Sequence, residues 1–131
     1  MRKFLRSFIV LLSLSLFVAC GGGGGAVGKA LAHQKAMLKI VEANKTDAAK
    51  AATELEAYIK SNEADLTAVK ADMEKLKAEA KDDMGKAMSI MKDNAEAIQE
   101  VQELKKKLRD EAKDVMNDEK VAELLRTVRG I

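Results

Sequence analysis

Apolar residues recur every three or four positions along most of the chain, which is the spacing of one face of a helix. A first such stretch covers residues 28–43 and ends at the polar run 44–47, whose side chains are typical of a turn and an N-cap. A second stretch, residues 47–60, ends at Ser61-Asn62, and acidic residues follow where a helix dipole favours them. The pattern therefore predicts two helices joined by short polar turns.

A third and longer periodic stretch follows. From Leu66 to Val115, fifteen apolar positions are separated by 14 steps over 49 residues, a mean of 3.5, which is the coiled-coil period. The steps are uneven, with three consecutive spacings of three after Ala95, and this favours a short bundle or hairpin over a long parallel dimer. Asn117-Asp118 offers a cap before a last segment. Residues 81–85 offer another bend, and the pattern leaves open whether the helix continues through Asp83–Gly85.

The composition supports helices throughout. The chain has no Pro and no Trp, and Ala, Glu, Lys, Leu and Met, which are good helix formers, dominate after the first 25 residues. Alternation of β-branched residues is almost absent, so strands are not expected. We predict an all-α fold for residues 29–131: an elongated helical hairpin or bundle with one long coiled-coil-like helix, preceded by a flexible Gly-rich N-terminal tether.

The first 19 residues differ from the rest of the chain. Basic residues at positions 2, 3 and 6 precede an apolar run from Phe8 to Ala19, which is the layout of a secretory signal peptide. As a helix, about 12 residues rise only about 18 Å, whereas a bilayer core is about 30 Å thick. We therefore predict that residues 1–19 are a cleaved signal peptide.

The end of this leader carries the most specific motif in the sequence. Leu16-Phe17-Val18-Ala19-Cys20 resembles the lipobox of bacterial lipoproteins, with Phe17 in place of the usual Leu. The resemblance implies a diacylglycerol thioether on Cys20, cleavage before Cys20, and acylation of the new amine. Several acyl chains on one residue can hold a small protein at a bilayer. The alternatives are an ordinary signal peptide with a free thiol, or a disulfide between two chains.

Five glycines, Gly21–Gly25, follow the cysteine directly. Gly-rich chains behave as flexible coils, so residues 20–28 are expected to form a tether between the acyl chains and the helical domain. In proteobacterial lipoproteins, an Asp after the cysteine typically signals retention in the inner membrane. Gly21 stands at this position, so the resemblance implies the outer membrane of the cell envelope, with the protein facing the periplasm.

Charge and residue types limit the chemistry. The chain carries +2, but without the leader 20 basic residues face 21 acidic ones, so nucleic-acid binding is not expected. His33 is the only histidine, and we interpret it as a surface or partly packed residue and not as a metal ligand. Carboxylate pairs such as Glu96–Glu100 and Asp110–Asp114 are expected to lie on exposed faces. We predict no catalytic residues, cofactor, metal or small-molecule substrate.

Two other clusters have a functional and a structural interpretation. Residues 105–109 (Lys-Lys-Lys-Leu-Arg) could contact anionic head groups or polymers, but flanking acidic residues favour a solvated helix face. Met84, Met88 and Met91 lie on one side of a helix and could form an adaptable partner site. Filling of the core is the favoured interpretation of these methionines.

These observations together predict a non-enzymatic, lipid-anchored envelope lipoprotein that acts as a helical scaffold or spacer, or binds a partner. Its plan resembles the murein lipoprotein, but that family ends in a Lys joined to peptidoglycan, whereas this chain ends Arg129-Gly130-Ile131. Wall attachment by that route is not expected. The alternative is a periplasmic or surface binding module, chaperone-like or an accessory subunit, that presents an apolar helical groove. The expected partners are the membrane, through acyl chains on Cys20, and a protein or a second copy through helical faces.

Overall fold

A computed structural model describes residues 25–127 of the chain. The predicted signal peptide, Cys20 and the first four glycines of the tether lie outside the described residues, as do residues 128–131. Within the described part, seven helices and no strand are present. The helices are α2 (Ala26–Ala43), α3 (Ala48–Ser61), α4 (Glu63–Asp82), α5 (Met84–Asp93), α6 (Ala95–Glu111), α7 (Lys113–Asn117) and α8 (Glu119–Arg126). The predicted all-α fold is therefore confirmed.

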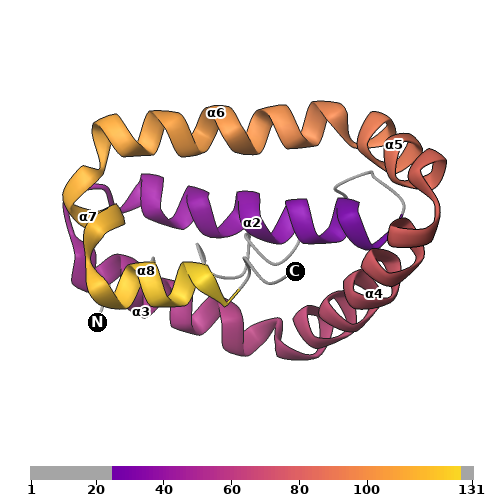
Figure 1. Cartoon of the computed structure of the whole chain (residues 1–131). Coiled ribbons are helices and arrows are strands. Elements are labelled where there is room, and N and C mark those ends of the chain that lie inside the picture. Colours follow the sequence, from indigo (N-terminus) through magenta and orange to yellow (C-terminus); the bar gives the residue numbers. More distant parts are fainter. Residues whose placement is uncertain (1–24, 128–131) are drawn as a thin grey trace.

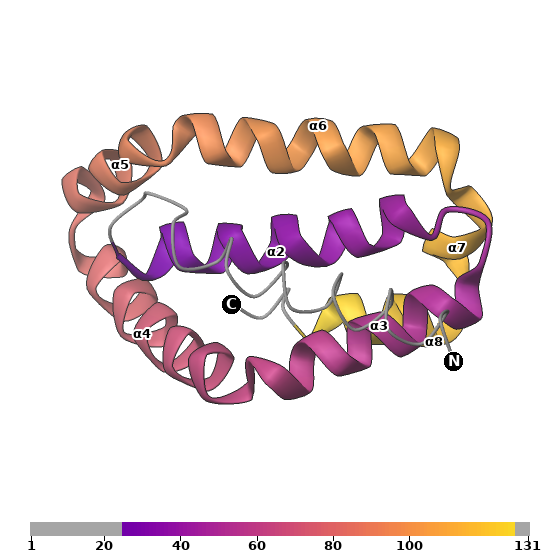
Figure 2. The ribbon, with the colours of Figure 1, turned by 180° about the vertical axis from the view of Figure 1, so that it is seen from behind.

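The helices form a closed ring around a central helix. In Figure 1, α3, α4, α5, α6 and α7 follow one another around α2, and α8 returns beside α3 to close the ring. The reverse view in Figure 2 shows the same arrangement, with α2 running along the middle of the ring. Helix α2 packs against α3, α4 and α6, so its apolar face is covered by segments that follow it in the sequence.

The predicted long coiled-coil-like helix is wrong, because the chain bends several times between Glu63 and Asn117. The longest helix within residues 25–127 is α4, with 20 residues. From α3 to α8, each helix is separated from the next by a single residue: Asn62, Asp83, Asn94, Ala112 or Asp118. The ring thus consists of consecutive helices that change direction at single non-helical residues.

Asparagine side chains end three of the helices. The side-chain Nδ2 of Asn44, Asn62 and Asn94 donates to the carbonyl four residues earlier in each case, at 2.8–2.9 Å. In α2 this bond gives a partner to the Ile40 carbonyl, which lies in the last turn, where carbonyls lack an intrahelical N–H. The carbonyls of Tyr58 and Ile90 also accept the backbone N–H of Asn62 and Asn94, so there the side chain adds a second bond at the end of the helix. Asn44 and Asn94 are buried, which places these joints inside the packed structure.

The first helix begins earlier than predicted. Gly25 is the N-cap of α2 and has a φ of 101°, a conformation that favours glycine. Ala26 and Val27 already belong to the helix, and so does the buried Gly28. The predicted tether, residues 20–28, is therefore shortened by three residues at this end, because helix formation begins as soon as the glycine run stops.

Aspartate side chains start three helices. Oδ1 of Asp47, Asp83 and Asp118 accepts from the backbone N–H three residues later, each at 3.0 Å. These bonds satisfy N–H groups that have no partner inside the helix. The turn at residues 44–47 and the cap at Asp118 agree with the prediction from the sequence. At Asp83, where the sequence left open whether the helix continues, one helix ends at Asp82 and the next begins at Met84.

Replacing Asp47 with alanine is expected to lower the free energy of unfolding by about 1 kcal/mol, because α3 loses its N-cap. The measurement is urea unfolding followed by circular dichroism. Asp110 is an exposed residue on α6 and gives the matched control, for which a change within about 0.5 kcal/mol is expected. Equal effects of the two substitutions would show that the cap does not stabilise α3.

The core lies between α2 and the ring. The most deeply buried large side chains include Met37 and Val41 from α2, Leu55 from α3, Val69 from α4 and Leu108 from α6. Burial of these side chains is the main favourable contribution to folding. Helix α5 has no buried residue and connects α4 to α6 at one end of the ring.

Candidate functional site

A histidine, a tyrosine and an aspartate meet where α2, α3 and α4 pack together. His33 Nδ1 lies 2.7 Å from the hydroxyl oxygen of Tyr58, and His33 Nε2 lies 2.8 Å from Oδ2 of Asp65. The two rings meet edge to face, with centroids 5.9 Å apart. Both nitrogens of the imidazole are therefore satisfied by side chains from two other helices.

The chemistry of Asp65 determines which groups donate and which accept in this network. The carboxylate of Asp65 can only accept, so a neutral His33 carries its proton on Nε2, and Nδ1 accepts from the Tyr58 hydroxyl. Burial of the hydroxyl, and to a lesser degree the charge of Asp65, raise the pKa of Tyr58 above its ordinary value. The hydroxyl therefore stays protonated and remains a hydrogen-bond donor.

This arrangement stabilises the fold and does not present a reactive group. His33 is 0% exposed and Tyr58 is 5% exposed, so no substrate can reach the imidazole or the hydroxyl. A tyrosine with a raised pKa is also a poorer nucleophile at neutral pH. The prediction of a surface or partly packed His33 is wrong: the residue is fully buried, because Tyr58 and Asp65 satisfy both of its ring nitrogens.

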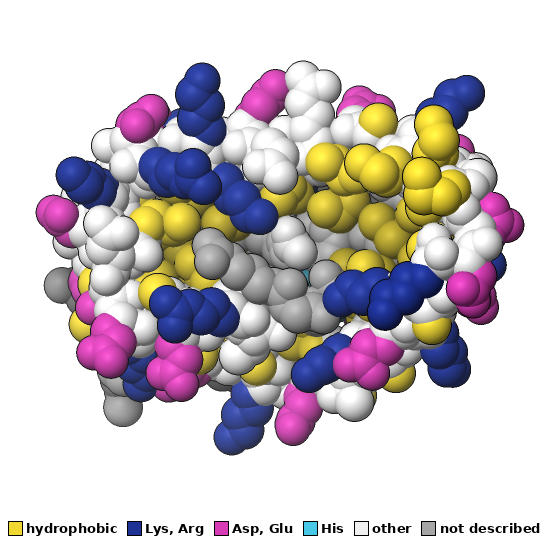
Figure 3. All heavy atoms as spheres, in the orientation of Figure 1, with side chains coloured by type: hydrophobic (Ala, Val, Ile, Leu, Met, Phe, Trp, Pro, Cys, Tyr) yellow, Lys and Arg dark blue, Asp and Glu magenta, His cyan; other side chains and the backbone are white. Residues whose placement is uncertain are grey.

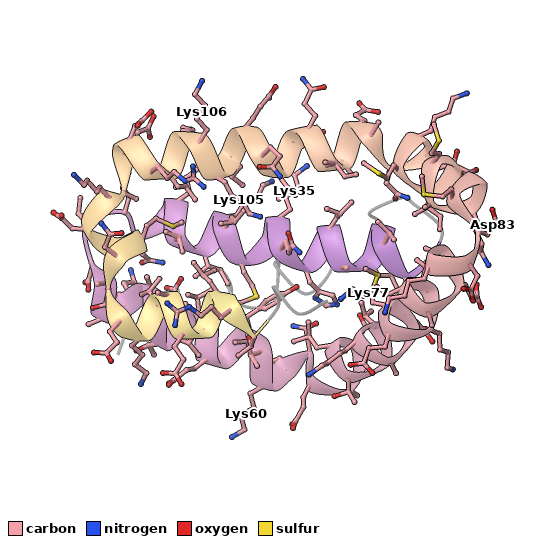
Figure 4. All side chains as sticks on the ribbon, in the orientation of Figure 1. Lys35, Lys60, Lys77, Asp83, Lys105 and Lys106 are labelled. Atoms are coloured by element: carbon pink, nitrogen blue, oxygen red, sulfur yellow. The ribbon has the colours of Figure 1, made fainter. Side chains whose placement is uncertain are left out.

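The basic stretch 105–109 faces in several directions. Lys107 donates to Glu42 at 2.6 Å, Leu108 is fully buried, and Lys106 is exposed and points away from the ring (Figure 4). The hydrogen bond and charge of Glu42 raise the pKa of Lys107. Lys105 and Arg109 line a depression on the surface of the described helices. The stretch is therefore not a continuous cationic patch.

That feature is a small depression between α2, α6, α7 and α8. It is lined by Gln34, Met37, Leu38, Lys105, Arg109, Met116 and Leu125, and its cavity volume is about 40 Å³. Pockets for small-molecule ligands are typically about 300–1,000 Å³. The depression is too small for such a ligand or for a helix of a partner protein.

Ion pairs connect the central helix to the ring. In addition to Lys107–Glu42, Lys35 on α2 pairs with Glu100 on α6, and this hydrogen bond lowers the pKa of Glu100. Lys120 on α8 pairs with Glu56 on α3 at 2.7 Å, which raises the pKa of Lys120. Exposed pairs of this kind contribute little stability, but they match the charges of helices that are distant in the sequence.

The predicted carboxylate pairs form no acidic site. Glu100 pairs with Lys35, while Glu96, Asp110 and Asp114 lie on exposed faces. Among residues 25–127, no group of three or more His, Cys, Asp or Glu residues could hold a metal ion.

Three methionines of α5 form the most exposed apolar feature of the described chain. Met84, Met88 and Met91 are 76%, 69% and 64% exposed. Figure 3 shows hydrophobic side chains gathered over the end of the ring that α5 forms. The prediction that these methionines fill the core is wrong, because they lie on α5, a helix with no buried residue that bridges α4 and α6. We call this group the methionine face.

Cys20, the predicted lipidation site, lies outside the described residues. The described helices include none with the length and apolar character needed to cross a bilayer. No protein-family model, curated protein or solved structure matches this chain.

Proposed function

We propose that this protein is a non-enzymatic bacterial lipoprotein, held in the cell envelope by acyl chains on Cys20, whose helical ring acts as a scaffold or spacer. The observation that carries the proposal is the sequence Leu16–Cys20, which resembles a lipobox and follows a basic and apolar leader. Because Gly21 follows the cysteine, we place the protein at the outer membrane, facing the periplasm.

The chain downstream of Cys20 is consistent with this role. A run of five glycines separates the cysteine from Ala26, the first residue of α2. We expect this run to act as a tether with a reach of very roughly 12 Å, which would hold a folded domain near a membrane surface. The ring and α2 bury one apolar cluster between them within a single chain. A domain of this kind needs no partner to complete its core.

The described domain offers little support for catalysis or for binding of a helical segment. His33 and Tyr58 are buried, only the Asp65 side chain of their network is partly exposed, and the depression near Lys105 is only about 40 Å³. A binding module that presents an apolar groove, whether a chaperone or an accessory subunit, needs a longer and wider surface than this depression. The scaffold role is therefore favoured over the groove-binding alternative.

Replacing Cys20 with alanine is expected to abolish lipid attachment. The mature wild-type protein should sediment with membranes and show the mass of the chain from Cys20 plus its acyl groups, whereas the variant should show no added mass and should leave the membrane fraction. The measurement combines membrane fractionation with intact-mass spectrometry. Ser13→Ala changes the apolar run of the leader, leaves the motif intact, and is the matched control. An unmodified thiol on the wild-type protein would overturn the proposal.

A further inference from the structure

The methionine face is an unusual surface for a helix of this chain. Met84, Met88 and Met91 follow one another at four and three residues, so they share one side of α5, and each is at least 64% exposed. Helix α5 is part of the closed ring, yet it has no buried residue. Contiguous exposed apolar side chains typically mark an interaction site.

We propose that the methionine face lies on the surface of the lipid bilayer to which Cys20 is attached. This inference rests on the proposed lipid anchor, and it adds an orientation: the ring contacts the membrane through α5 and not through any other helix.

The position of the tether favours this occupant. The chain enters the ring at Gly25, and the first turn of α2 lies at the end of the ring where α4 meets α5 (Figures 1 and 2). From Cys20 to Ala26 the chain can extend at most about 21 Å. The opposite end of α2 is about 27 Å further away, because this helix has 18 residues. Lipid attachment at Cys20 therefore keeps the α5 end of the ring close to the bilayer.

The chemistry of the face suits a membrane interface. Methionine side chains are apolar, flexible and polarisable, so they adapt to the irregular boundary between head groups and acyl chains. The charges around them are balanced. Lys81, Lys86 and Lys92 lie on or next to α5, and so do three acidic residues at positions 82, 83 and 93. Contact should therefore depend on insertion of apolar side chains and should not require anionic lipids.

A second copy of this chain is a less suitable occupant. Three methionines provide a patch of at most a few hundred Å². A stable interface needs about 800 Å² from each partner, so the methionine face alone is too small for a dimer. A weak contact with lipid is sufficient, however, because the tether makes this contact intramolecular and raises the effective concentration of the membrane.

The test places an environment-sensitive bimane fluorophore on α5 of the lipidated, full-length mature protein. Met88→Cys provides the labelling site, since the thioether of a lipidated Cys20 does not react. The protein is reconstituted into phosphatidylcholine vesicles with brominated acyl chains, which quench a probe that reaches them. Lys50→Cys is the matched control, because this residue is exposed in the first turn of α3, a helix that begins at the end of the ring opposite α5.

The probe at position 88 is expected to be quenched strongly, at low and high salt alike, and the probe at position 50 is not. Adding Met84→Gln and Met91→Gln should lower the ratio of docked to undocked protein by roughly tenfold, because two apolar side chains no longer enter the lipid. Circular dichroism checks that these variants remain folded.

Three outcomes would overturn the inference while leaving the lipid anchor in place. The first is equal quenching at the two positions, and the second is a water-like spectrum at position 88 in protein that floats with the vesicles. The third is excimer formation by a pyrene label at position 88, which would identify a second copy as the occupant. If the protein does not float with vesicles at all, the lipid anchor itself fails, and the inference fails with it.

Discussion

Replacing His33 with alanine is expected to lower the free energy of unfolding by about 3–5 kcal/mol. The substitution leaves a cavity at a site that is 0% exposed, where the central helix α2 packs against α3 and α4. It also removes the acceptor of the buried Tyr58 hydroxyl and the donor that faces Asp65. A buried hydroxyl without a partner costs about 1–3 kcal/mol by itself, in addition to the loss of packing.

Urea unfolding of the single and double variants separates these two contributions. Tyr58→Phe removes the hydroxyl but retains the ring, so the double variant with His33→Ala should be less destabilised than the sum of the single variants. Lys39→Ala, an exposed substitution on the same helix, is the control and should change stability by less than about 0.5 kcal/mol. If His33→Ala behaves like this control, the network does not stabilise the fold.

The helices were predictable from the sequence because their periodic apolar residues and polar caps are local signals. The turn before Asp47 and the bends at Asp83 and Asp118 each depend on an aspartate that caps the next helix. The joint at Asn94 was not predicted, although the unevenness of the apolar spacing begins directly after it, at Ala95. A one-residue break in a helix changes the spacing of the apolar residues that follow it. This change in spacing was the sequence signal for the joint at Asn94.

The closure of the ring was not predictable in the same way. A mean spacing of 3.5 is compatible with one straight helix and with several short ones, since both present an apolar side to a neighbour. The difference lies in contacts between distant residues, such as those of α2 with α6 and of α3 with α8. Charge pairs across the ring, such as Lys107 with Glu42, 65 residues apart, cannot be assigned from local patterns.

For the candidate sites too, the position of a residue on its helix could be predicted from the sequence, whereas its burial and its distant contacts could not. Met84, Met88 and Met91 were correctly placed on one side of a helix, but their exposure depends on what the ring leaves uncovered. The His33 network joins residues 25 and 32 positions apart. Tyr58 is the only aromatic residue after the leader, and its isolation in an Ala-rich helix was the one sequence signal for this network.

Replacing Leu108 with alanine is expected to lower the free energy of unfolding by about 2–5 kcal/mol, although this residue lies within the basic stretch 105–109. Leu108 is 0% exposed and belongs to the core, whereas the adjacent Lys106 is exposed. If residues 105–109 form a solvated helix face in which only Leu108 is buried, substitutions at Leu108 and Lys106 should differ strongly in their effect on stability. Lys106→Ala should change stability by less than about 0.5 kcal/mol.

Thermal and urea unfolding of the two variants, in parallel with the unmodified chain, measure this difference. A lysine that only extends into solvent contributes little to stability, because exposed charges are well hydrated in the folded and the unfolded states. Truncation of Leu108 instead removes packed methyl groups from the region where α6 meets α2, and the surrounding helices relax only in part. Comparable destabilisation by both substitutions would mean that the stretch acts as a unit, and a small effect of Leu108→Ala would mean that α6 does not hold the ring against the central helix.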